Sequence, residues 1–92
     1  MSHLSIKEIY ERLEDLPLWE LHGDEITRTF SFNDFKEAMK FVNEVAQEAE
    51  EMNHHPDIFI NYNRVKISLT THDANGLTHE DFILAKVIEK MV

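Results

Sequence analysis

The chain has 92 residues, of which 42% are hydrophobic and 29% are charged, and these values are typical of one small globular domain. It contains no cysteine, which excludes disulfides, thiolate nucleophiles and sulfur-ligated zinc. Nine Lys and Arg residues oppose 18 Asp and Glu residues, so the formal charge is −9 with neutral histidines. A field of that sign repels phosphate backbones, and we expect no direct binding to nucleic acid.

The sequence gives no sign of a membrane span or of a nucleotide-phosphate site. No run of about 18 apolar residues is present, and the N-terminal stretch lacks an apolar export segment, so we expect a cytoplasmic protein. The two glycines, Gly23 and Gly76, fall in no glycine-rich phosphate-binding pattern.

A helix and a hairpin are predicted first. Ser5-x-x-Glu8 is a capping box, and the apolar residues behind it recur at helical spacing, which predicts a helix over about 5–15. The stretch 18–32 predicts two extended segments that are joined by a turn at Gly23-Asp24.

A long amphipathic helix is predicted next. Asn33 is a suitable N-cap, and apolar residues then recur every three or four positions opposite a face of Lys and Glu. This pattern predicts a helix of about twenty residues that ends near Asn53.

A second hairpin follows the interruption at His54-His55-Pro56. The runs 58–62 and 65–70 alternate in polarity, and Asn63-Arg64 is expected to form the turn between them.

A final helix completes the predicted order α-ββ-α-ββ-α. Thr78-x-x-Asp81 is another capping box, and the segment 82–91 has a helical pattern. Separate hairpins and helices predict an α+β fold, with helices packed on one face of a four-stranded antiparallel sheet. We expect one domain over 1–92.

Three of the six histidines are expected at the ends of elements. His54 and His55 follow the long helix, and His72 ends the last strand. These places can meet, because the last hairpin packs against the helix that precedes it. Imidazole titrates near neutral pH, so such a group can both donate and accept protons. The residues alone leave three alternatives open, namely solvated turn histidines, acid–base catalysis and a metal site. The metal site is disfavoured because adjacent histidines rarely point at one ion.

Three further residues have roles that the sequence leaves open. Trp19 is most simply a core residue, and the alternative is an aromatic wall for a flat ligand. Glu50 and Glu51 close the long helix at the end where the helix dipole disfavours acids. They are either solvated, or one of them orients a nearby imidazole or accepts hydrogen bonds from the nitrogens of a ligand.

The same residues resemble the signature of the pterin-4a-carbinolamine dehydratase family. The similarity follows the spacing of Glu50, His54-His55-Pro56, Tyr62, His72 and Asp81, which are separated in turn by three, five, nine and eight residues. The similarity extends to the segments around these positions and also to Trp19-Glu20-Leu21 and Phe30-x-Phe32. The resemblance therefore covers almost the whole chain. Two positions depart from the common pattern: Ile58 stands where an aromatic residue is frequent, and Asn53 stands where Asp is frequent.

The resemblance implies dehydration of 4a-hydroxytetrahydropterins to quinonoid dihydropterins, with no metal and no organic cofactor. It implies a catalytic role for His54, His55 and His72. Contacts to the pterin are expected from seven residues: Asn53, His54, His55, Thr70, Thr71, His72 and Asp73. Supporting roles are expected for Glu50, Trp19 and Asp81.

The resemblance also bears on assembly and on a different class of function. It implies a homodimer or a homotetramer. The alternative function is a non-catalytic protein-binding or dimerisation module, similar to the transcriptional coactivator role of animal relatives. Such a role would leave the histidines dispensable.

Overall fold

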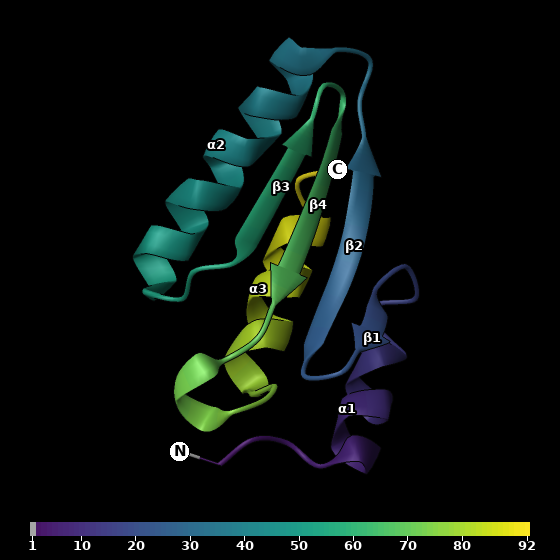
Figure 1. Cartoon of the computed structure of the whole chain (residues 1–92), viewed down its shortest axis with the longest axis vertical. Helices are drawn as coiled ribbons and strands as arrows, with labels where there is room; N and C mark the ends of the chain where they lie inside the picture. The colour runs from purple at the N-terminus through teal and green to yellow at the C-terminus, as the bar shows by residue number, and fades with distance from the viewer. Residues whose placement is uncertain (1) are drawn as a thin grey trace.

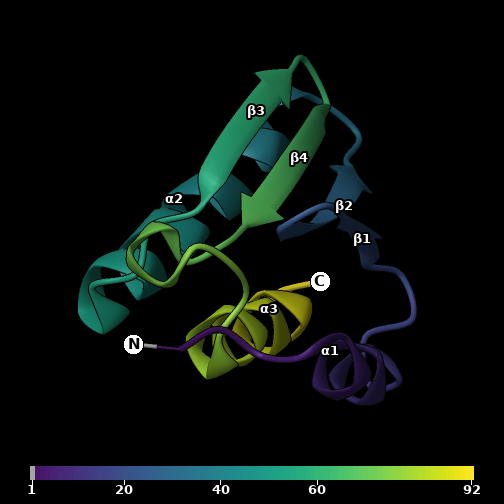
Figure 2. The same cartoon turned by 60° about the horizontal axis from the view of Figure 1, so that its bottom comes forward.

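The predicted order of elements is confirmed by the computed structural model, which describes residues 2–92 (Figure 1). The elements, in chain order, are α1 (Ile6–Leu13), β1 (Glu20–His22), β2 (Glu25–Ser31), α2 (Phe35–Met52), β3 (Asp57–Asn61), β4 (Arg64–Leu69), a single 3-10 turn η1 (His72–Ala74) and α3 (His79–Glu89). All strand pairs are antiparallel, and the strand order is β1-β2-β4-β3. Figures 1 and 2 show α2 and α3 on the same face of the sheet, with α1 beside α3.

The core lies between the sheet and these helices. Alternate residues of the two central strands face it, including Ile26 and Phe30 of β2 and Val65 and Ile67 of β4, each at most 2% exposed. Each such side chain contributes roughly 1.5–3 kcal/mol through burial. The helices complete the core with these buried residues: Ala38, Phe41, Val42, Val45 and Ala49 of α2, and Phe82, Leu84, Ala85 and Ile88 of α3. Within residues 2–92, no helix combines the length and apolar character that a membrane span requires.

The N-terminus of α2 differs from the prediction by one residue. Asp34, and not Asn33, is the N-cap, and its side chain accepts a hydrogen bond of 2.8 Å from the Glu37 N–H. The carboxylate also complements the positive end of the helix dipole, which favours Asp over Asn at this position.

The second hairpin also turns one residue earlier than predicted. Arg64 already belongs to β4, and the residue with positive φ is Tyr62, at 52°. A bulky residue rarely adopts this conformation. Asn63 stabilises it from the neighbouring position, because its side-chain amide donates to the Phe32 carbonyl over 2.9 Å and its own carbonyl accepts the Phe32 N–H.

A half-buried ion pair ties β2 to the last turn of α3. The Arg28 guanidinium bonds both carboxylate oxygens of Glu89, and their side chains are 17% and 28% exposed. The Trp19 indole N–H donates to the same carboxylate over 2.7 Å, and Arg28 lies 4.2 Å from the centre of the Phe30 ring. One carboxylate therefore holds donors from two segments that are 61 and 70 residues away in sequence.

We expect Glu89→Ala to lower the free energy of unfolding by about 1–3 kcal/mol, because it leaves the Arg28 and Trp19 donors unpaired in a half-buried place. Urea denaturation measures the change. The matched control on the same helix is Lys86→Ala, which removes an exposed 3.4 Å pair with Asp15 and is expected to cost at most about 1 kcal/mol. Equal losses in the two variants would contradict the structural role of the Arg28–Glu89 pair.

Candidate active site

The end of α2 turns the chain so that His54 faces the interior. Asn53 takes the left-handed conformation at φ 51° and caps the helix. Its N–H donates to the Glu50 carbonyl over 3.1 Å, and the His54 N–H donates to the Ala49 carbonyl over 3.0 Å. Asn and Asp both tolerate this backbone conformation better than most residues. The departure from the family pattern at Asn53 therefore preserves the turn.

His54 is buried against the start of α3, where it meets Asp81. The imidazole is part of a residue only 8% exposed, and its Nε2 lies 2.5 Å from Asp81 Oδ1. Asp81 is 0% exposed, and its Oδ2 accepts from the Thr71 hydroxyl over 2.8 Å and from the Thr78 N–H over 2.9 Å. Asp81, which the sequence places in a capping box with Thr78, thus also bonds His54.

The contact with Asp81 indicates which His54 nitrogen carries a proton. An ionised carboxylate can only accept, so with Asp81 ionised the His54 Nε2 is the donor and Nδ1 is left for other contacts. Nδ1 lies 3.6 Å from Glu80 Oε2, whose side chain is 48% exposed. Sequence reasoning did not single out Glu80, although its place beside Asp81 in the first turn of α3 is a signal that it shares the site.

His72 enters from the other side, at the start of η1. The loop behind it is closed by a bridge in which the Thr71 N–H donates to the Gly76 carbonyl over 3.1 Å and the Gly76 N–H donates back over 3.3 Å. A Cβ on Gly76 would lie 2.9 Å from His3 Cβ, so the close approach of the N-terminal segment requires glycine here. The Leu4 N–H also donates to the Leu77 carbonyl over 2.7 Å. The N-terminal segment therefore braces the loop that carries His72.

These two segments surround one hollow of about 220 Å³. It is lined by the seven residues for which pterin contacts are expected: Asn53, His54, His55, Thr70, Thr71, His72 and Asp73. His55 and His72 are exposed, in contrast to His54. Imidazoles from segments about twenty residues apart in sequence thus line the same hollow.

The expected supporting residues lie in different surroundings. Glu50 Oε2 is 3.5 Å from His55 Nε2, and both side chains are exposed, so solvent weakens this pair. Asp81 holds His54 as described. Trp19 is 4% exposed and packs edge-on against Phe30 at 6.2 Å between ring centres, so it is a core residue and does not line the hollow. Within residues 2–92, no three His, Asp or Glu side chains are grouped so as to hold a metal ion.

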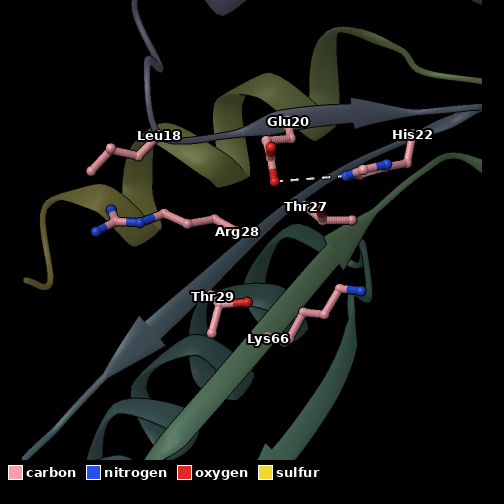
Figure 3. A pocket seen from close by; sticks show the side chains of 7 residues that line it. All are labelled: Leu18, Glu20, His22, Thr27, Arg28, Thr29 and Lys66. Atoms are coloured by element: carbon pink, nitrogen blue, oxygen red, sulfur yellow. Dashed lines mark ion pairs between the residues drawn. The ribbon is translucent and has the colours of Figure 1, made fainter.

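A larger hollow, of about 390 Å³, lies on the face of the sheet opposite the helices and is less suited to acid–base chemistry. Figure 3 shows Glu20 and His22 facing each other, while Arg28 and Lys66 extend in opposite directions. The single imidazole is 3.7 Å from the Glu20 carboxylate, and both side chains are more than half exposed. The hollow lined by three histidines is therefore the candidate active site.

Fold and site together define a small α+β protein in which histidines from two segments face one shallow hollow. The family model described as Pterin 4 alpha carbinolamine dehydratase matches residues 2–91. A relative from Acidobacterium capsulatum is 54% identical over 92 residues and covers 100% of both chains. One from Sulfurisphaera tokodaii is 50% identical over 92 residues and covers 100% of this chain and 99% of its own. Both relatives carry the name pterin-4-alpha-carbinolamine dehydratase only provisionally. The chain belongs to the pterin-4a-carbinolamine dehydratase family.

Two solved structures share this fold, and the first of them also supports the family assignment. A Brucella melitensis protein described as a transcriptional coactivator/pterin dehydratase has a TM-score of 0.94 and 37% identity, with 98% of each chain covered. A pterin dehydratase-like protein described as a RuBisCO assembly factor in the alpha-carboxysome has a TM-score of 0.66, with 79% of this chain and 84% of that chain covered. Its identity is 18%, so it shows the fold alone.

We expect Asp81→Asn to free His54. The carboxylate has two acceptor oxygens for its three donors, whereas the amide has only one acceptor oxygen. The free energy of unfolding should fall by about 1–3 kcal/mol. Long-range ¹H–¹⁵N spectra should show a proton on His54 Nε2 in the wild type and a redistribution towards Nδ1 in the variant.

Glu80→Gln is the matched control, since it makes the same chemical change at the neighbouring, half-exposed position. It should leave the Nε2 proton in place and alter stability by less than about 1 kcal/mol. If the neutral His54 ring of the wild type carried no proton on Nε2, the result would contradict the assignment of this hydrogen bond.

Proposed function

We propose that this protein is a dehydratase that removes water from a 4a-hydroxytetrahydropterin and yields a quinonoid dihydropterin. The observation that carries the proposal is the convergence of His54, His55 and His72 on one hollow that Asn53, Thr70, Thr71 and Asp73 also line. Membership of the family supports the same reaction.

The reaction requires a proton donor and a proton acceptor on a flat substrate. The C4a–O bond breaks as the hydroxyl receives a proton and leaves as water. The proton on the adjacent ring nitrogen is removed, and a C=N double bond forms between that nitrogen and C4a. One imidazolium and one neutral imidazole supply these two transfers, so the step is balanced without an oxidant, a metal or an organic cofactor.

In this proposal the three rings have different duties. His54 is held by Asp81, which presents its ring in a fixed orientation and leaves only Nδ1 for a proton transfer. His55 and His72 are exposed and exchange protons with solvent between turnovers. Asn53 and Asp73 also line the hollow, and their amide and carboxylate groups suit the donor and acceptor edge of the pyrimidine ring.

We expect His54→Ala, His55→Ala and His72→Ala each to lower the rate of dehydration while the protein remains folded. At least one should lose about 10²-fold or more, because a general acid or base contributes roughly 10²–10⁴-fold. Ultraviolet absorbance follows the conversion of the 4a-hydroxytetrahydropterin, with the uncatalysed rate subtracted.

His22→Ala and His79→Ala are the controls, since neither residue lines the hollow. Both are expected to retain nearly full activity. Wild-type rates in all three site variants, or no turnover above background by the intact protein, would overturn the proposal. The second result would favour a non-catalytic binding role, in which the histidines are dispensable.

We also propose that the protein is a homodimer or a homotetramer. β3 is an outer strand of the sheet, and it carries apolar side chains on both faces, with Phe59 65% and Ile60 37% exposed. Association would cover this edge, which is otherwise free to pair. Light scattering at micromolar concentration should give a multiple of the mass of one chain, and the mass of a single chain would contradict the proposal.

A further inference from the structure

His54 has to regain its starting protonation state after every turnover of the proposed reaction. In that reaction one imidazole gives a proton to the departing hydroxyl, and another takes the proton from the ring nitrogen. The two rings therefore end each cycle with their protonation states exchanged, whichever ring has which part. Water resets His55 and His72 directly, because both are exposed. The His54 side chain is only 9% exposed, so its reset needs a defined route.

Asp81 closes one nitrogen of His54 to this exchange. Nε2 lies 2.5 Å from Asp81 Oδ1, and Oδ2 of the same carboxylate accepts from the Thr71 hydroxyl and the Thr78 N–H. Asp81 is 0% exposed, so its carboxylate offers no path to bulk water. Exchange with solvent is therefore left to Nδ1.

A proton can reach His54 by way of the hollow or by way of Glu80. His54 lines the hollow, and a bound ligand would displace the water there. Glu80 Oε2 lies 3.6 Å from Nδ1, and the Glu80 side chain is 48% exposed. Glu80 does not line the hollow, so it stays in contact with water when a ligand is bound. The separation is slightly longer than a hydrogen bond, and one bridging water or a small rotation of the exposed side chain would connect the two groups.

The place of Glu80 follows from the burial of Asp81. The two acids are consecutive residues in the first turn of α3. One turn of helix thus supplies a buried carboxylate for Nε2 and a half-exposed carboxylate near Nδ1.

We propose that Glu80 relays protons between bulk water and His54 Nδ1, so that His54 is reset even while a ligand fills the hollow. This inference rests on the proposed function, because it takes His54 as a proton donor or acceptor in the dehydration. Glu80 acts only through His54 and does not touch the pterin. The role falls to a residue that belongs neither to the family signature nor to the lining of the hollow.

Steady-state kinetics of Glu80→Gln test the relay, since the amide keeps the size of the side chain but does not carry the proton. At saturating 4a-hydroxytetrahydropterin, kcat should fall about tenfold, which is less than the roughly 10²–10⁴-fold that a general acid or base contributes. KM should fall in parallel and kcat/KM should stay within about twofold of the wild type, because at low substrate the hollow is empty between turnovers and water resets His54 there. The matched control is Glu44→Gln on α2, which removes the same charge from an exposed residue away from the hollow and should leave kcat unchanged.

Chemical rescue separates a relay from a structural role. In Glu80→Ala the missing side chain leaves room for a small acid, and formate at constant pH and ionic strength should restore kcat to within about twofold of the wild type. Formate should not restore Glu80→Gln, in which the amide fills that room. The uncatalysed rate is subtracted at each formate concentration.

Three results would overturn this inference while the wild type turns over: a wild-type kcat in Glu80→Gln, an equal fall of kcat and kcat/KM in that variant, or the same response of both variants to formate. Absence of turnover by the wild type would overturn the proposed function with it.

Discussion

The candidate site depends on one buried carboxylate. Asp81 is 0% exposed, and an ionised group in such a place is costly unless hydrogen bonds surround it. Its donors are the His54 imidazole, the Thr71 hydroxyl and the Thr78 N–H. These groups come from the end of α2, the end of β4 and the start of α3. The hydrogen bonds to Asp81 therefore help to hold the two histidine-bearing segments together.

This arrangement separates rigid from adaptable parts of the site. His54 is buried and bonded to Asp81, while His55 and His72 are exposed. The His72 side is braced from outside by the N-terminal segment, where the Leu4 N–H bonds the Leu77 carbonyl and His3 covers Gly76. A fixed ring supplies orientation, and exposed rings supply exchange of protons with water, so the division suits acid–base chemistry.

Most of the fold could be predicted from the sequence, because capping residues and polarity patterns within each element indicate its type. The capping boxes at Ser5 and Thr78 and the alternation in the hairpins gave the confirmed order of elements. The error at the second hairpin arose from a contact with a distant segment. Tyr62 takes a positive φ because Asn63 is bound to Phe32, and this contact spans 31 residues.

Long-range contacts explain why the site could be predicted only in part. The spacing of the histidines and the family resemblance named the seven residues that line the hollow. Neither indicated that Asp81 bonds His54 across 27 residues, or that Trp19 is held in the core by Glu89 across 70 residues. Such pairings depend on packing in three dimensions, and local periodicity carries no information about them.

A crystal structure with a bound oxidised pterin tests the assignment of the site most directly. We expect the fused ring in the hollow between His54, His55 and His72, with its pyrimidine edge towards Asn53 or Asp73. A pterin bound instead on the open face of the sheet, beside His22 and Lys66, would contradict the assignment.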